Sequence, residues 1–256
     1  MSLKSSLLLK FGINDITPEF EKGYNFFFGL FGKIDTNKER RKILQKIQGY
    51  THVSYARLKF LWDACEKMTT EGRRGAFVET GVWRGGCAGI LAYISKKYGY
   101  KNALYFFDSF EGLPQPTHED GADARIFADK KIDGKMEAIN KLIAPESYIK
   151  KLLFEKLQIE ADKVNIVKGW FQDTLPAVKN KIGPISILRL DGDWYESTKV
   201  ALENLYDQVE AGGMILIDDY YFWDGCRRAV DEFIVDRKLK VKMKKQDLDG
   251  TYFIKE

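Results

Sequence analysis

Short apolar runs without alternation mark the second half of the chain. Such runs are typical of strands buried on both faces of a parallel sheet. We expect strands at 76–80, 104–108, 164–169, 185–191 and 214–219. Helical spacing predicts helices at 86–98, 136–157 and 199–210, the last ended by Ala211-Gly212-Gly213. Alternating strands and helices predict an α/β fold with right-handed crossovers.

The C-terminal segment changes this pattern. Lysines alternate with apolar residues over 238–245, which predicts an edge strand with one solvated face. We expect segments 240–245 and 251–255 to form an antiparallel hairpin, because the residues between them, 246–250, have turn composition. Added to five parallel strands, this hairpin gives a Rossmann-like, seven-stranded, mostly parallel sheet.

The first part of the chain lacks this alternation. We predict a mainly helical N-terminal extension or cap over 1–70 and one α/β domain over 71–256. The aromatic run Phe26-Phe27-Phe28-Gly29-Leu30-Phe31 predicts a docking segment. It fits a homodimer contact, and an intramolecular packing surface would look the same.

Composition narrows the class of protein. The net charge of +4 over 256 residues does not suggest a nucleic-acid partner, and no apolar run reaches the length of a membrane span. Three cysteines without a CxxC pair argue against a disulfide framework and favour a cytoplasmic protein. Two histidines are too few for a typical zinc site.

Carboxylates follow two of the predicted strands directly. Asp191 ends one apolar run, and Asp218 and Asp219 end the next. The carboxyl ends of neighbouring parallel strands open onto one crevice, so these side chains are expected to meet. Three charged carboxylates need a cation or a proton between them, and an oxygen-liganded ion such as Mg²⁺ fits best.

The first predicted strand leads into a glycine-containing turn. Gly81 lets the backbone pass close to a ligand, but the G-x-x-x-G-G pattern departs from the dinucleotide fingerprint. Glu79 favours a cationic group such as an ammonium, and Asp108 stands where related folds bind a ribose diol. Together they indicate S-adenosylmethionine. The alternatives are an ordinary tight turn and, for Asp108 or Ser109, a helix N-cap.

Four segments of the chain, 77–86, 107–114, 169–176 and 190–198, carry recognisable motifs. In this order they resemble the macrocin O-methyltransferase family. That family contains class I, metal-dependent, S-adenosylmethionine-using enzymes that methylate sugar hydroxyls of natural products. The resemblance covers roughly residues 50–235.

The resemblance implies roles for particular residues. Asp191, Asp218 and Asp219 would ligate Mg²⁺. The cofactor would be held by Glu79, Thr80, Gly81, Val82, Trp83, Asp108 and Ser109. Trp170 and Phe171 would lie near the adenine, with core packing as the alternative role.

The hydroxyl of a sugar must lose its proton as it attacks the methyl group. Catechol O-methyltransferases carry a lysine three residues after the first metal aspartate, where this chain has Trp194. We therefore expect Asp191, or a water that it positions, to accept the proton. For His118, the role of a reserve base competes with that of an ordinary solvated loop residue. Asp193 either orients a metal ligand or, as we favour, caps the helix that begins near Tyr195.

Two other functions compete with sugar O-methylation. Asp191-Gly192-Asp193 could be the DxD motif of a nucleotide-sugar glycosyltransferase, but this leaves Glu79 and Asp108 without a purpose. A non-catalytic interaction module is the other alternative, and the intact carboxylates argue against it. The acceptor stays open between a natural-product glycoside, a surface-polysaccharide sugar and a modified sugar precursor.

Overall fold

A seven-stranded sheet forms the centre of the protein, with strand order β3-β2-β1-β4-β5-β7-β6. The computed structural model describes residues 18–129 and 136–256. Strands β1 to β5 are parallel, and β7 runs antiparallel to both β5 and β6. This confirms the predicted α/β fold. The strands are β1 (Ala76–Thr80), β2 (Leu104–Asp108), β3 (Val164–Lys168), β4 (Ile185–Leu190), β5 (Val209–Ile217), β6 (Lys244–Lys245) and β7 (Thr251–Ile254).

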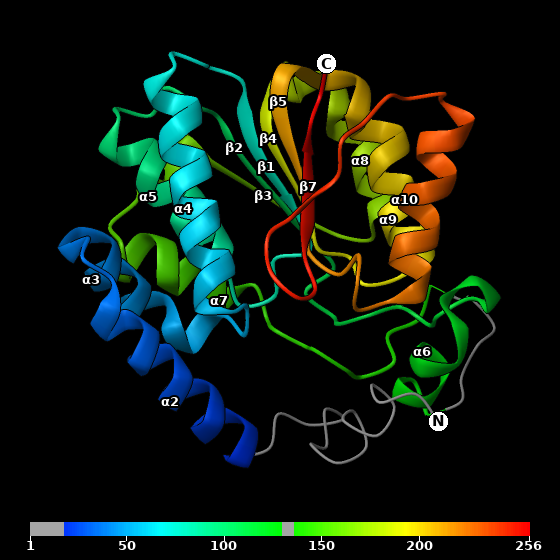
Figure 1. Cartoon of the computed structure of the whole chain (residues 1–256), viewed down its shortest axis with the longest axis horizontal. Helices are drawn as coiled ribbons and strands as arrows, with labels where there is room; N and C mark the ends of the chain where they lie inside the picture. Colours follow the sequence, from blue (N-terminus) through cyan, green and yellow to red (C-terminus); the bar gives the residue numbers. More distant parts are fainter. Residues whose placement is uncertain (1–17, 130–135) are drawn as a thin grey trace.

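Helices cover both faces of the sheet (Figure 1). The helices on one face are α3 (Lys38–Ile47), α4 (Tyr55–Thr70), α5 (Gly86–Lys97) and α7 (Ser147–Lys150). Those on the other face are α8 (Phe171–Ile182), α9 (Tyr195–Leu205) and α10 (Asp224–Asp236). Helix α2 (Pro18–Ile34) lies below α3 and α4 in Figure 1, and α6 (Gly121–Phe127) follows β2. None of these described helices is long and apolar enough to cross a membrane.

The core explains the unbroken apolar runs. All five residues of β1 and all six of β4 are buried. Successive side chains of a strand point to opposite faces. Accordingly Phe77 packs in the cluster beneath α4 and α5, whereas Val78 packs with α8 to α10. Both faces of the sheet therefore need apolar residues.

The helical extension packs onto the same core. The Asn37 side chain accepts a hydrogen bond from the Arg40 amide and caps α3. Ile43, Leu44 and Ile47 of α3 belong to the cluster that contains one face of the sheet. The first 17 residues of the predicted extension lie outside the described residues. The division into an extension over 1–70 and a domain over 71–256 stays a prediction.

The predicted helix at 136–157 is wrong for its first half. Helix α7 occupies only Ser147–Lys150 and continues as a π-helical turn over Lys151–Lys156. The segment before it instead pairs with the loop after β2, through a bridge between Pro114 and Ala138. Pro145 further disfavours a helix there, because proline restricts the residue before it.

The expected helix stop at Ala211-Gly212-Gly213 is also wrong. Helix α9 ends at Leu205, and these three residues belong to β5. Gly212 has a φ of 79°, and its amide donates to the carbonyl oxygen of Lys255. The two glycines therefore shape the start of a strand and do not end a helix.

The C-terminal edge strand is shorter than predicted. β6 comprises only Lys244–Lys245, which pair with Tyr252 and Thr251 of β7. The alternation of lysines and apolar residues before β6 still predicts correctly which side chains are partly buried. Leu239, Val241 and Met243 pack against the core without forming a strand.

Candidate active site

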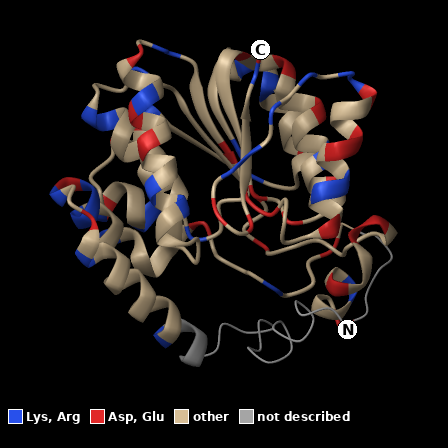
Figure 2. Cartoon of the chain, in the orientation of Figure 1, with Lys and Arg blue, Asp and Glu red and all other residues tan. Residues whose placement is uncertain are grey.

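A cavity of about 780 Å³ opens where the parallel strands end. Acidic residues gather at this centre of the molecule (Figure 2). The strand order reverses between β1 and β4, and ligands bind at such a switch point. Of the expected site residues, the cavity is lined by Glu79, Gly81, Val82, Trp83, Asp108, Ser109, Trp170, Phe171, Asp191, Asp218 and Asp219. Thr80 is buried beside the cavity and does not line it.

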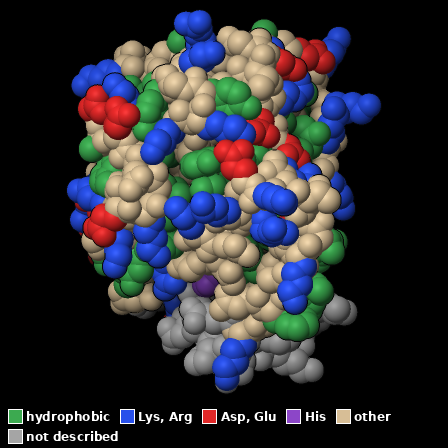
Figure 3. Space-filling view, turned by 90° about the vertical axis from the view of Figure 1, so that its left-hand side faces the viewer, with side chains coloured by type: hydrophobic (Ala, Val, Ile, Leu, Met, Phe, Trp, Pro, Cys, Tyr) green, Lys and Arg blue, Asp and Glu red, His purple; other side chains and the backbone are tan. Residues whose placement is uncertain are grey.

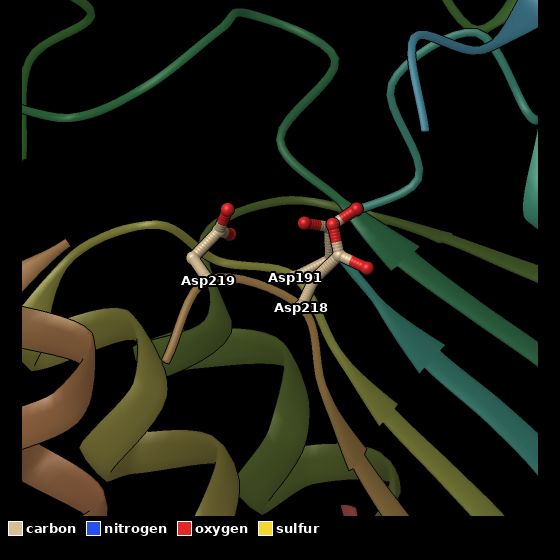
Figure 4. Close-up of side chains that lie close together, drawn as sticks. All are labelled: Asp191, Asp218 and Asp219. Atoms are coloured by element: carbon tan, nitrogen blue, oxygen red, sulfur yellow. The ribbon is translucent and has the colours of Figure 1, made fainter. Parts of the chain in front are cut away.

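Three aspartates from β4 and β5 meet at this edge of the sheet. One carboxylate oxygen from each of Asp191, Asp218 and Asp219 lies within 4.8 Å of the other two (Figure 4). Carboxylate oxygens at this spacing can share one divalent cation. The structure thus brings together the residues that the sequence placed at two separate strand ends.

Two buried arginines reach the same aspartates, and the sequence analysis missed both. Arg189 in β4 donates to Asp191 Oδ2 at 2.7 Å and to Asp218 Oδ1 at 2.6 Å. Arg57 of α4 donates to Asp218 Oδ2 at 2.6 Å. Arginine side chains therefore compensate part of the negative charge, which the sequence analysis assigned wholly to a metal ion or a proton. An arginine inside an apolar strand run was the available signal.

Burial shifts the ionisation of these carboxyl groups. Desolvation raises the pKa of Asp191 to about 6, although Arg189 opposes the shift. Desolvation also raises the pKa of Asp219 well above its usual value, helped by the neighbouring Asp193 and Asp191. Crowded carboxylates in a buried site favour a cation that relieves their repulsion.

Glu79 lies at the end of β1, and only 1% of its surface is exposed. Its Oε1 accepts a hydrogen bond from Arg189 at 2.7 Å, while Oε2 is buried without a partner among the described residues. Burial raises the pKa of Glu79 to about 8, with Arg189 opposing the shift. An unsatisfied buried oxygen beside a cavity suits a cationic ligand group.

Gly81 lets two strand ends approach closely. Its φ is 85°, and a Cβ there would overlap the backbone carbonyl of Asp191. The Asp191 amide also donates to the Thr80 carbonyl oxygen at 2.8 Å. Gly81 thus admits the loop that carries Asp191, and it also lines the cavity in which the sequence predicts a ligand.

Asp108 fixes the turn after β1. Its Oδ2 accepts hydrogen bonds from the amides of Val82 and Trp83 at 2.7 and 2.8 Å. Its Oδ1 accepts from the Phe110 amide at 2.6 Å. Each carboxylate oxygen can accept more than one hydrogen bond, so a ribose hydroxyl can still bind. Ser109 donates to the carbonyl oxygen of Gly112 and holds the following turn.

Aromatic side chains form the walls of the cavity. Trp83 packs against the ring of His52, with ring centres 4.6 Å apart, and its indole nitrogen has no partner among the described residues. Trp170 and Phe171 line another part of the cavity, where β3 leads into α8. These rings offer flat apolar surfaces of the kind that an adenine ring can stack on.

The favoured role of Asp193 as a helix cap is wrong. Asp193 has a φ of 57°, and its Oδ1 accepts a hydrogen bond from the Trp223 indole at 2.9 Å. The first turn of α9 is capped by Asp120, whose Oδ1 accepts from the Tyr195 amide at 2.6 Å. Trp194 is the N-cap residue but makes no side-chain cap bond, so the distant Asp120 supplies the acceptor, which local spacing cannot reveal. Burial raises the pKa of Asp193 to about 8, reinforced by Asp191.

The segment after β2, which carries Asp120, is docked on α9. Trp194 is buried, and its indole nitrogen donates to the carbonyl oxygen of Pro114 at 2.9 Å. Trp194 also packs edge-to-face against Phe127 and Trp223. Trp194, which stands where catechol O-methyltransferases have a lysine, thus anchors this segment.

The two histidines have different surroundings. His118 is exposed and does not line the cavity, so its role as a reserve base gains no support. His52 does line the cavity. Burial lowers the pKa of His52 to about 4, and the nearby charge of Arg84 adds to this shift.

Helix α2 covers one side of the cavity. Tyr24, Phe27, Phe28 and Phe31 all line the cavity. Tyr24 packs against Phe28, and Phe28 packs against Tyr55, whereas Phe27 and Phe31 remain 57% and 45% exposed. On the face seen in Figure 3, Lys and Arg side chains are spread among other residues with Asp and Glu between them. The homodimer that the aromatic run predicts stays a prediction, which sedimentation of the purified chain can test.

The strand order and the carboxylate-lined cavity at the switch point are those of a class I methyltransferase, and the comparisons make it an S-adenosylmethionine-dependent O-methyltransferase. The family model described as "Macrocin-O-methyltransferase (TylF)" matches residues 32–255. The chain belongs to this family.

Two curated relatives come from Streptomyces. The chain is 37% identical over 185 residues to 8-demethyl-8-(2,3-dimethoxy-alpha-L-rhamnosyl)-tetracenomycin-C 4'-O-methyltransferase of Streptomyces olivaceus, covering 72% of this chain and 67% of the relative. It is 32% identical over 205 residues to demethyldecarbamoylnovobiocin O-methyltransferase of Streptomyces niveus, covering 80% and 75%. The solved structure of the O-methyltransferase NovP matches with a TM-score of 0.69 and 31% identity, covering 80% of this chain and 82% of that one.

Proposed function

We propose that this protein is a Mg²⁺-dependent sugar O-methyltransferase. The observation that carries the proposal is the single cavity that joins Glu79, Asp108 and the aspartate triad in a chain of this family. A nucleotide-sugar glycosyltransferase would use Asp191 and Asp193 but would leave Glu79 and Asp108 without a role. Family membership also favours methyl transfer over that alternative.

The residues present fit S-adenosylmethionine. The unpartnered Oε2 of Glu79 would accept a hydrogen bond from the cofactor's ammonium group. Asp108 would accept from the ribose hydroxyls, and the rings of Trp170 and Phe171 would pack against the adenine. When bound, the cofactor supplies an electrophilic methyl group. The protein's part is to hold that group next to the triad.

The aspartate triad fits a divalent cation. Asp191, Asp218 and Asp219 would provide oxygen ligands of the type that Mg²⁺ prefers. A cation there would lower the cost of forming an alkoxide on the acceptor. Arg57 and Arg189 hold Asp218 from two sides, which limits the rotation of that carboxylate.

Two carboxylates are candidates for accepting the proton of the sugar hydroxyl. Asp191 is the one that the sequence favours, but its Oδ2 is bound to Arg189 and its other oxygen would face the cation. Asp193 lines the same cavity outside the triad, with one oxygen held by Trp223. We expect Asp193→Asn to keep ligand affinity and lose turnover, and Asp191→Asn to lose Mg²⁺ affinity as well.

A sugar-bearing molecule is the proposed acceptor. The name of the relative from Streptomyces olivaceus describes a rhamnosyl-bearing acceptor. The apolar side chains of Phe27 and Phe31 from α2 line the same cavity as the carboxylates. This combination suits a sugar attached to an apolar group. A surface-polysaccharide sugar is the second acceptor class to include in a screen.

Calorimetry tests the proposal. S-adenosylhomocysteine and Mg²⁺ are titrated separately into the wild type, Asp219→Asn and Asp162→Asn. Asp219 takes part in no ion pair among the described residues. Its substitution therefore removes a proposed Mg²⁺ ligand without breaking an ion pair. Asp162 is an exposed carboxylate that does not line the cavity, so Asp162→Asn serves as the control for the same change of side chain at Asp219.

We expect the wild type to bind both ligands. Asp219→Asn should lose about tenfold or more in Mg²⁺ affinity and keep its affinity for S-adenosylhomocysteine. The Asp162 control should match the wild type. A wild-type chain that binds no S-adenosylhomocysteine would refute the proposed function. Unchanged Mg²⁺ affinity in Asp219→Asn would refute the metal site.

A further inference from the structure

Arg189 is the only described residue whose side chain donates to both a proposed cofactor group and the proposed metal ligands. Its Nη1 donates to Glu79 Oε1 and to Asp191 Oδ2, both at 2.7 Å. Its Nη2 donates to Asp218 Oδ1 at 2.6 Å. The side chain is 3% exposed, so water does not compete for these bonds.

The register of the sheet explains this arrangement. Arg189 of β4 lies directly beside Glu79 of β1, and residues two apart on a strand share a face. Asp191 follows Arg189 by two positions and therefore points to the same side. Asp218 follows Leu216, the β5 partner of Arg189, by the same spacing. One guanidinium thus stands at the centre of three carboxylates on one face.

We propose that Arg189 is a positioning residue shared by the two ligand sites. It orients Asp191 and Asp218 for the cation, and it holds Glu79 so that the second oxygen of that carboxylate faces the cofactor. Arginine suits this task because its planar group presents several donors in fixed directions, which a lysine ammonium cannot reproduce. The inference rests on the proposed function and adds to it Arg189, which would act through the three carboxylates that it holds.

Arg57 provides an internal comparison. It donates to Asp218, and it also pairs with Asp247 and Asp249 in the turn before β7. It makes no described contact with Glu79. Arg57 can therefore influence the cation through Asp218, but it has no direct path to the cofactor group.

Arg40 provides a control outside the cavity. It is a buried arginine of α3 that pairs with Asp35 and Asp63. An Arg40→Lys variant disturbs a buried ion-pair network of the same kind without touching either ligand site. Any loss of affinity caused by general loosening of the fold should appear in this variant too.

The test measures S-adenosylhomocysteine and Mg²⁺ affinity by calorimetry in the wild type, Arg189→Lys, Arg57→Lys and Arg40→Lys, together with the thermal unfolding temperature of each. We expect Arg189→Lys to weaken Mg²⁺ binding by about 10- to 100-fold and the binding of S-adenosylhomocysteine by about tenfold. Arg57→Lys should weaken Mg²⁺ alone. Arg40→Lys should lower only the unfolding temperature.

The outcomes separate this inference from the proposed function. Failure of the wild type to bind either ligand would refute the proposed function itself. If the wild type binds both and Arg189→Lys keeps both affinities, Arg189 is not a positioning residue, even if its unfolding temperature falls. Should Arg189→Lys fail to fold, Arg189→Gln replaces it. That variant keeps a donor toward Glu79, and unchanged Mg²⁺ affinity in it would equally refute the inference.

Discussion

Asp120 connects the segment after β2 to the start of α9, and its replacement by alanine should lower the stability of the protein. Its Oδ1 accepts from the Tyr195 amide at 2.6 Å, and its Oδ2 accepts from the amide and hydroxyl of Thr117 at 2.7 and 3.1 Å. Asp120 is 1% exposed, so water cannot easily replace these bonds. The variant loses a helix cap and leaves two amides without their acceptor.

The structure gives the size of this effect. Each buried amide left unsatisfied costs roughly 1–3 kcal/mol, and the loss of the cap is already included because the Tyr195 amide is one of the two. Because burying the carboxylate already carries a cost, which appears as the raised pKa of Asp120, we take the lower end of the sum. We expect Asp120→Ala to lower the free energy of unfolding by about 2–4 kcal/mol. In a domain of this size, that corresponds to roughly 5–15 °C in unfolding temperature.

Thermal and urea unfolding, followed by circular dichroism, measure this change. Asp120→Asn keeps one acceptor oxygen and should lose less than the alanine variant. Asp162→Ala removes an exposed carboxylate and should unfold like the wild type. A loss of under about 1 kcal/mol in Asp120→Ala would refute the capping argument, because a cap alone is worth that much.

Two further predictions use other features of the site. Gly81→Ala should abolish Mg²⁺ binding or folding, because the added Cβ would overlap the Asp191 carbonyl. Gly183 has a φ of 73° but open space around it, so Gly183→Ala should lower the free energy of unfolding by only about 1 kcal/mol. The pKa of His52 is lowered to about 4 by burial and by Arg84, so the unfolded chain binds a proton first as pH falls from about 6.5. Stability should therefore decrease by about 1–2 kcal/mol between these values after allowing for solvent screening, and urea unfolding of His52→Asn should show a flatter pH profile. An equally steep profile in that variant would exclude His52 as the cause.

Much of the fold followed from the sequence because strand burial leaves a direct trace. A strand covered on both faces must be apolar throughout, and the predicted limits of β1 and β2 agree with the structure. The triad was predictable for a related reason. Asp218 follows the apolar run of β5, and topology alone brings the ends of parallel strands together.

The parts that failed depend on contacts between distant segments. Nothing near Tyr195 in the sequence indicates that Asp120 supplies its cap. Helical spacing over 136–157 did not reveal that Ala138 pairs with Pro114. The sequence did not indicate the role of Arg189, because its contact with Glu79 depends on the register between β1 and β4, which the sequence does not specify.

The balance of charge in the cavity links the arginines to the proposed ligands. Seven carboxylates and two guanidinium groups line the cavity, so the arginines can offset only part of the negative charge. These carboxylates are Glu79, Asp108, Asp191, Asp193, Asp218, Asp219 and Asp249. The excess cannot persist as bare charge in a buried site. A divalent cation beside the triad and a cationic cofactor group beside Glu79 would both reduce it. The two arginines therefore leave an excess of negative charge that suits the proposed cation.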